Sequence, residues 1–422
     1  MAKYAIDLTP LKKYPDFRNL WTAGLISYFG SMITYVALPF QLKELTGSYL
    51  AVGLLGVVEI VPLIIFGLYG GVLADSVDRK KMVWATEAGA LILVLVLLGN
   101  SLLGSPTTLA IYLVAALFAV VDGLQRPSMD AMLPRLVSHE DLPAASALLS
   151  LRWQLGVIVG PTIGGIIFST MSVSAGYVVD IATYVLSLLF LARVRSIPPS
   201  KEAEKPSLAA LFDGVKYAFK RQDLLGTYII DLAAMTLAMP MALYPFWADE
   251  LNAPWALGMF YAAITVGSVI VTLTSGWTRT YRFHGRAVIL AAMGWGLAIA
   301  AAGLSNSLIL VLLFLTIAGA SDMVSALFRG NIWNQTIPDT LRGRLAGIEL
   351  LSYSVGPLAG QLRAASMAAA TTLSISVTSG GLMCVVVVAL LAIFLPKMWK
   401  YDVQTNEFAV REREIRKNRE IS

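Results

Sequence analysis

The chain has 422 residues, of which 57% are hydrophobic and 14% are charged, and its formal net charge is +5. An average soluble domain carries about a quarter charged residues, so a water-soluble core cannot bury this apolar excess and lipid must cover much of the chain. The basic residues lie between apolar runs, which argues against a nucleic-acid partner. The single cysteine, Cys384, excludes both a disulfide framework and a cysteine metal site within one chain.

Apolar runs long enough to cross a membrane as helices recur from end to end of the chain. These runs and their flanking breakers predict twelve transmembrane helices, at 17–41, 49–74, 82–103, 107–127, 144–170, 173–194, 222–248, 255–277, 286–306, 308–330, 344–369 and 372–396. The predicted fold class is an all-α membrane protein with an N-terminal six-helix bundle (1–194), a cytoplasmic linker (195–221), a C-terminal six-helix bundle (222–396) and a cytoplasmic tail (397–422). Within the linker, residues 208–221 have helical apolar spacing and are expected to lie along the membrane surface.

The basic residues gather on one side of the predicted membrane. Of the 32 Lys and Arg residues, all but Lys43, Arg152 and Arg363 fall in the terminal segments, in the linker or in loops on the same side. Cytoplasmic segments carry an excess of Lys and Arg, so both termini are expected to be cytoplasmic.

The loop after the second predicted helix carries four residues that suit a gate, namely Gly71, Asp75, Arg79 and Lys80. Gly71 allows a close helix approach, and Asp75 can accept from helix N-terminal amides or pair with Arg79. The basic residues can anchor at anionic lipid headgroups. The alternative is a basic anchor without a gating role. The equivalent stretch of the second half, 275–279, has no acidic residue, so a latch is expected to be stronger in the first half.

The fifth predicted helix contains Gly156, Gly160, Pro161 and Gly164. Small residues at this spacing let helices pack closely, and Pro161 removes one backbone hydrogen bond so that the helix can bend. Taken alone, the pattern indicates a packing face.

The second half of the chain repeats landmarks of the first half in the same order and at a nearly constant offset. The matches are Leu38-Pro39-Phe40 with Tyr244-Pro245-Phe246, Gly53 with Gly258, Gly71 with Gly276, Pro134 with Pro338, and Gly160-Pro161-x-x-Gly164 with Gly356-Pro357-x-x-Gly360. Parallel six-helix halves related by an axis along the membrane normal define one large transporter architecture.

The run from Gly71 to Lys81 resembles the signature of the major facilitator superfamily, with Ser76 and Asp78 in place of the usual basic residue and glycine. The pattern in the fifth helix resembles the motif typical of exporters in that superfamily. The N-terminal segment 11–18 and Arg152 are similar to the branch that includes enterobactin exporters and drug efflux proteins. The resemblance implies the major facilitator fold, a place in the bacterial inner membrane, and export.

Several ionisable residues lie inside the predicted helices: Glu59, Asp122, Arg152, Asp180, Asp231, Asp322 and Glu349. Each costs about 2.5 to 3.5 kcal/mol in hydrocarbon on insertion scales, so each is a functional candidate. Because the acids outnumber the one clearly buried base, some of them must bind a proton or a cation during part of the cycle.

We predict that Glu59 and Asp231 are the leading proton or cation sites, and that Arg152 is the switching partner of Asp122 or Asp231. Asp122 and Asp322 are further coupling candidates that could instead only satisfy arginines near the cytoplasmic mouth. Any one of these acids could also be a static partner of an arginine, the backbone or water. For Asp180 a static role is favoured, because the sixth helix is peripheral in the family.

The resemblance also implies a substrate cavity where the first, fourth, seventh and tenth helices meet. Aromatic and methionine side chains form an adaptable apolar wall suited to amphiphilic molecules. The candidate lining residues are Tyr28, Met32, Tyr35, Met235, Met239, Met323 and Trp333.

We therefore expect a proton-coupled antiporter that exports an amphiphilic small molecule, such as a drug or a siderophore, by alternating access. The alternative transport function is symport of a nutrient; a non-transporting sensor is a further alternative. Neither an enzyme nor a metal site is expected, because His139 and His284 have no neighbouring ligands. Without a Walker-type loop, the proton gradient is the expected energy source, with no cofactor. The expected partners are the substrate and membrane lipids, and the chain is expected to be a monomer.

Overall fold

The computed structural model describes residues 7–198 and 216–421. Every regular element in those ranges is helical, which confirms the predicted fold class. Among the described residues, eleven helical segments, some of which join adjacent elements, are long and apolar enough to cross a membrane. The 32-residue helix α14 (Asp339–Ala370), which covers the eleventh predicted span, is not among these eleven. The chain is a multi-pass membrane protein.

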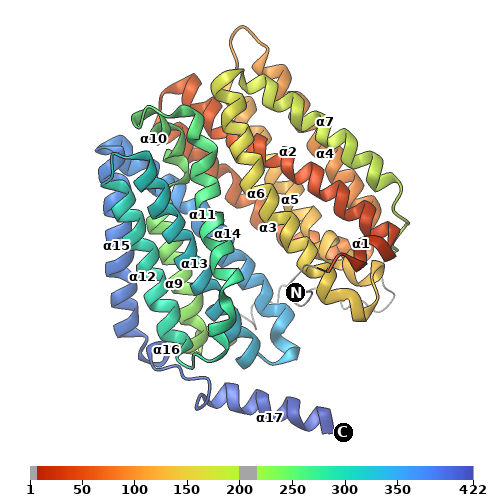
Figure 1. Ribbon diagram of the computed structural model, residues 1–422, viewed down its shortest axis with the longest axis vertical. Helices are drawn as coiled ribbons and strands as arrows, with labels where there is room; N and C mark the ends of the chain where they lie inside the picture. The colour runs from red at the N-terminus through yellow and green to blue at the C-terminus, as the bar shows by residue number, and fades with distance from the viewer. Residues whose placement is uncertain (1–6, 199–215, 422) are drawn as a thin grey trace. The chain divides into compact units, whose positions relative to one another are not determined.

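The chain divides into two compact units, and unit 1 comprises Met1–Pro206 together with Ala248–Ala262. Within unit 1, α2 packs against α6 and α7, α4 packs against α5 and α7, and α3 packs against α5. Figure 1 shows α7 running alongside α2. The helices of the first stretch are α1 (Thr9–Lys13), α2 (Pro15–Thr46), α3 (Tyr49–Ser76), α4 (Arg79–Ser101), α5 (Thr108–Leu136), η2 (His139–Asp141), α6 (Leu142–Thr170) and α7 (Val173–Ala192).

Unit 2 comprises Ser207–Trp247 and Ala263–Ser422. In this unit α12 packs against α13 and α15, and α9 packs against α14 and α15. The elements from the linker onward are α9 (Gln222–Ala238), η3 (Met241–Leu243), α10 (Tyr244–Glu250), η4 (Pro254–Ala256), α11 (Leu257–Leu273), η5 (Ser275–Arg279), α12 (His284–Gly303), α13 (Leu308–Thr336), α14, α15 (Leu373–Phe394), α16 (Pro396–Trp399) and α17 (Glu407–Ile421). Residues of α10 and α11 are shared between the two units.

Hydroxyl side chains cap the N-termini of equivalent helices in the two halves. Ser172 accepts a hydrogen bond of 3.2 Å from the backbone three residues further on at the start of α7. Thr372 does the same at 3.1 Å at the start of α15. Such a hydroxyl satisfies an amide that has no partner within the helix. The last helix of each bundle therefore starts by the same device.

Glycines of the repeated Gly-Pro motif let one helix approach the first helix of its own unit. A Cβ atom on Gly160 of α6 would lie 2.6 Å from the Cβ of Met32 on α2. A Cβ atom on Gly360 of α14 would collide with the backbone oxygen of Met235 on α9 and would lie 2.9 Å from the Cβ of Met239, which directly follows α9. Both distances are too short for a real contact, so the missing side chain is what permits this packing.

Several helices differ from their predicted bounds; α5, for example, runs to Leu136, past its predicted end at 127. The predicted helix 222–248 is interrupted, because α9 ends at Ala238 and Pro240 precedes the short turn η3. Proline has no backbone N–H to continue a helix. Helix α13 runs beyond its predicted end at 330 to Thr336, so Arg329 lies seven residues before the end of the helix. The expected surface helix at 208–221 falls largely outside the described residues.

Candidate functional site

A buried charge cluster joins α9 and α13 in unit 2. Arg329 of α13 forms an ion pair with Asp231 of α9, and its other terminal nitrogen lies 3.8 Å from Asp322. The side chains of Arg329 and Asp231 are 8% and 6% exposed, and that of Asp322 is 32% exposed. One base thus faces two acids. The cluster has an excess negative charge when both carboxyls are ionised and is neutral when one of them holds a proton.

The space beside this cluster is very small. A cavity of about 10 Å³ is lined by Asp231, Met235, Trp295, Asp322 and Arg329, among others. That volume holds about one water molecule. In this structure the cluster therefore suits a proton or a water molecule, and not an amphiphilic substrate.

The partner of Asp231 differs from the sequence prediction, which offered Arg152. The apolar run ends close to Arg329, so the sequence placed this arginine at the cytoplasmic mouth. In the structure Arg329 forms an ion pair with Asp231 and also lies near Asp322. Arg152 lies on α6 of unit 1, where its guanidinium occupies the space beside Gly24 of α2.

The expectation of a single clearly buried base is wrong. Arg79, Arg221 and Arg329 are each 7% exposed or less. Each belongs to a region that the sequence assigned to a loop or a helix end. Apolar runs mark where lipid lies, but they do not show how far a helix or its neighbours extend past that run.

The acids predicted in unit 1 lie on two packed helices. Glu59 is half-buried on α3, and Asp122 is exposed on α5. Neither forms an ion pair with a residue that the structure describes. The pairing of Asp122 with Arg152 or Arg126 stays a prediction.

The gate motif is described only at its basic end. The backbone N–H of Arg79 donates to the carbonyl of Ile197 at 3.0 Å. The ammonium of Lys80 donates to the carbonyl of Ala192 at 3.1 Å. These bonds tie the start of α4 to the end of α7 and the chain that follows it. Gly71 and Asp75 lie on α3, and their surroundings fall outside the described residues.

Most residues proposed for the substrate cavity pack against neighbouring helices of their own unit. The ring of Tyr28 lies where a Cβ on Gly156 would be, and Met32 lies in the same way against Gly160. Tyr35 is 37% exposed, and its ring meets that of Tyr261 edge-on at 5.9 Å. In unit 2, Met235 and Met239 are buried beside α14, and Met323 is half-buried on α13.

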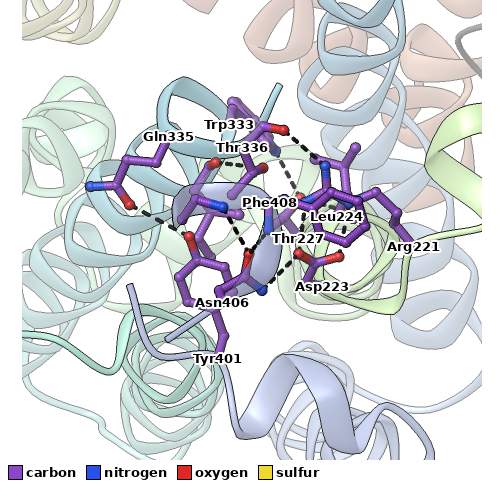
Figure 2. A network of polar contacts seen from close by, with 12 residues as sticks. Arg221, Asp223, Leu224, Thr227, Trp333, Gln335, Thr336, Tyr401, Asn406 and Phe408 are labelled. Carbon is purple, nitrogen blue, oxygen red and sulfur yellow. Dashed lines mark hydrogen bonds and ion pairs between the residues drawn. The ribbon is translucent and has the colours of Figure 1, made fainter. Parts of the chain in front are cut away.

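Trp333 belongs to a polar network at one end of unit 2, shown in Figure 2. Its indole N–H donates to the hydroxyl of Thr227 at 2.8 Å, and its ring stacks on Tyr228 with centroids 5.4 Å apart. Trp333 thus packs against α9 near the end of α13, and its place in a cavity wall stays a prediction.

The centre of the same network is a buried ion pair between Arg221 and Asp223, with an N–O distance of 2.7 Å. The ring of Phe408, from the tail, lies 3.8 Å from the Arg221 guanidinium carbon. The amide of Asn406 donates to Asp223 at 3.4 Å. The tail thus covers the start of α9.

The sequence profile of the MFS transmembrane secretion effector family matches residues 5–419. The chain belongs to this family. Enterobactin exporter EntS of Shigella boydii serotype 18 is 29% identical over 400 residues, which cover 94% of this chain and 96% of that protein. EntS of Escherichia coli O81 matches with the same identity and coverage.

Solved structures support the fold of this transmembrane secretion effector. A bacterial homologue of the human lysosomal transporter Spinster has a TM-score of 0.73 at 12% identity, covering 92% of this chain and 98% of that one. A mutant of the nucleoside transporter NupG has a TM-score of 0.72 at 13% identity, covering 91% and 100%. The chain is a major facilitator transporter of the efflux type, and it resembles the enterobactin exporters.

The sequence interpretation of this transporter missed Glu87. This carboxyl is 5% exposed on α4. It accepts hydrogen bonds from Ser27 at 3.1 Å, from Gln125 at 2.9 Å and from Ser187 at 3.1 Å. A lone acid within an apolar helix was the available signal. Because Glu87 lies close in sequence to the basic residues at the start of α4, the sequence suggests a position at the membrane interface. The structure shows that it is buried inside unit 1.

Proposed function

We propose that this transmembrane secretion effector is a proton-coupled antiporter that exports an amphiphilic small molecule by alternating access. The observation that carries the proposal is the cluster in which Asp231 and Asp322 share Arg329. The first substrate to test is the siderophore enterobactin, because proteins named enterobactin exporters are 29% identical over nearly the whole chain.

The cluster links protonation to access by water. With both acids ionised, it holds an uncompensated charge whose burial is costly, so the state exposed to water is favoured. With one proton bound, the cluster is neutral and can be enclosed. Exposure to the opposite side then allows the proton to leave. The transporter alternates between two conformations that open to opposite sides of the membrane. Substrate leaves the cell in one transition and a proton enters in the reverse transition, so the two are exchanged.

The proposed setting is the bacterial inner membrane, with both termini in the cytoplasm. The distribution of Lys and Arg supports this orientation. The proposed transporter works as a monomer in contact with membrane lipids, and it takes its energy from the proton gradient without a cofactor.

The test uses the purified full chain in liposomes that contain a pH-sensitive dye. With an imposed pH gradient, added enterobactin should cause proton movement opposite to its own, and Asp231→Asn should reduce this movement at least tenfold. Glu140→Gln, which changes an exposed acid in η2, is the matched control and should keep wild-type rates.

Protons that move in the same direction as the solute would instead support the symport alternative. Absence of coupled proton movement with enterobactin and with a panel of amphiphilic drugs would end the proposal. A deletion strain that still secretes its siderophore but becomes sensitive to drugs would move the substrate class to drugs.

A further inference from the structure

A row of buried and half-buried polar side chains lies between α2 and α7 inside unit 1. We call it the polar seam, and define it as Ser27, Ser31, Thr34 and Gln41 of α2, Tyr177, Asp180, Tyr184 and Ser187 of α7, and Glu87 of α4. The α7 members recur every three or four residues and so share one helix face. From Tyr177 to Ser187 this face extends about 15 Å along the helix axis.

Glu87 forms one end of the polar seam. Its two carboxyl oxygens are bonded by Ser27 on α2 and Ser187 on α7, each at 3.1 Å, and Gln125 of α5 adds a bond of 2.9 Å. One step further, the hydroxyls of Ser31 and Tyr184 lie 2.8 Å apart. The carboxyl thus connects four helices of the unit.

Asp180 lies further along the polar seam and is fully buried. Its carboxyl is bonded to the hydroxyl of Thr34 on α2 and, at 3.1 Å, to that of Thr183 on its own helix. A Cβ atom on Gly30 of α2 would collide with both Asp180 and Thr183. The absence of a side chain at Gly30 therefore creates the space that the carboxyl occupies.

The charged and titratable groups around the two carboxyls do not neutralise them by contact. Neither Glu87 nor Asp180 has an ion pair with any residue in the described ranges. Arg152 of α6 interacts electrostatically with Glu87, and Asp180 interacts in the same way with Tyr177, Tyr184 and Glu87. Two ionised carboxylates enclosed in this way would be costly, and a bound proton on each removes that cost.

We propose that Glu87 and Asp180 form a second proton-binding site, inside the first bundle and separate from the Asp231–Arg329–Asp322 cluster. Proton binding forms an O–H bond on a carboxylate oxygen with water as the donor, and release returns that proton to water. The hydroxyls of the polar seam can donate or accept, so they can bond to either form of the carboxyl. The use of this site in transport rests on the proposed proton coupling, whereas proton binding itself does not.

The test is infrared difference spectroscopy of the purified full chain in lipid, recorded between acidic and alkaline pH. The C=O stretch of a protonated carboxyl reports the site directly. We expect Glu87→Gln and Asp180→Asn each to remove a separate component of the pH-dependent band, and Thr34→Val to shift the Asp180 component. Glu140→Gln is the matched exposed control and should leave these components unchanged.

A pH-dependent band that is the same in wild type, Glu87→Gln and Asp180→Asn would overturn the proposal, and so would components that do not change with pH. If Asp180→Asn fails to fold, a shift of the infrared band in Thr34→Val tests Asp180 instead. If Glu87→Gln fails to fold, a shift in Ser187→Ala tests Glu87. Liposome transport is measured on the same variants. Normal infrared components without coupled transport would contradict the proposed function and leave the second site standing.

Discussion

The two bundles share a packing scheme but bury their charges in different places. In unit 1, Glu87 and Asp180 lie between the helices α2, α4 and α7. The helices of unit 2 that correspond to α4 and α7, namely α12 and α15, contain no acidic residue. Unit 2 instead carries Asp231 and Asp322 on α9 and α13, where Arg329 meets both. The repeat therefore preserves helix contacts and not chemistry.

This difference indicates a division of roles between the halves. Carboxyls held by hydroxyl and amide groups can gain or lose a proton without losing a charged partner. Carboxyls that share an arginine change their ion pair whenever a proton binds. The first arrangement suits storage of a proton, and the second suits a switch that is linked to a conformational change.

The largest expected effect comes from removing the shared base. Arg329→Met leaves Asp231 and Asp322 without their cation, and breaking a buried ion pair costs about 3–5 kcal/mol. Denaturant unfolding in detergent should show a loss of that size in the free energy of unfolding. In unit 1, Glu87→Gln keeps a group that its neighbours can bond and should cost about 1 kcal/mol. Equal losses in the two variants would remove the distinction between the bundles.

The shared packing scheme is tested at the two equivalent glycines. Gly160→Ala and Gly360→Ala should each lower the free energy of unfolding by about 1–3 kcal/mol, because the added methyl group has no room. Gly99→Ala is the matched control in α4, where no neighbouring atom lies within 4 Å. This control should raise stability by about 0.5–1 kcal/mol. A loss in only one half would show that the two interfaces are not equivalent.

The smallest effect is expected at the tail of unit 2. Hydrogen bonds from Arg282 hold the pKa of Asp402 below its ordinary value. Because the pKa of Asp402 is lowered, its ionised carboxylate stabilises the contact at every pH above the ordinary carboxyl pKa. This stabilisation is lost as the pH falls through the lowered pKa. The contact should therefore be constant around neutral pH and weaken only in strong acid.

The measurement uses a fluorophore attached at Glu407→Cys in a Cys384→Ser background. Its anisotropy should stay constant between about pH 5 and pH 8 and fall at lower pH. Asp402→Asn should give the lower anisotropy at every pH. A fall centred near neutral pH would assign the change to another group.

The sequence predicted the helices well, because length and hydropathy decide whether a segment can cross a membrane. It offered Arg329 as a possible partner of Asp322, which lies on the same helix. It could not predict the ion pair of Arg329 with Asp231, because these residues lie on different helices and share no local pattern. Glu87 was missed because Ser27, Gln125 and Ser187 come from three other helices, and no local pattern brings them together. Pro240 was visible in the sequence, yet a continuous helix was predicted across it.

The tail covers the start of α9. The ring of Phe408 packs against the guanidinium of Arg221, and the amide of Asn406 donates a hydrogen bond to the carboxylate of Asp223. A shortened gene product that stops before Asn406 would leave this ion pair open to water. Purification handles are therefore better fused after the last residue than used to replace the tail. Loss of expression in such a truncation would report damage to the α9 bundle and would say nothing about the substrate.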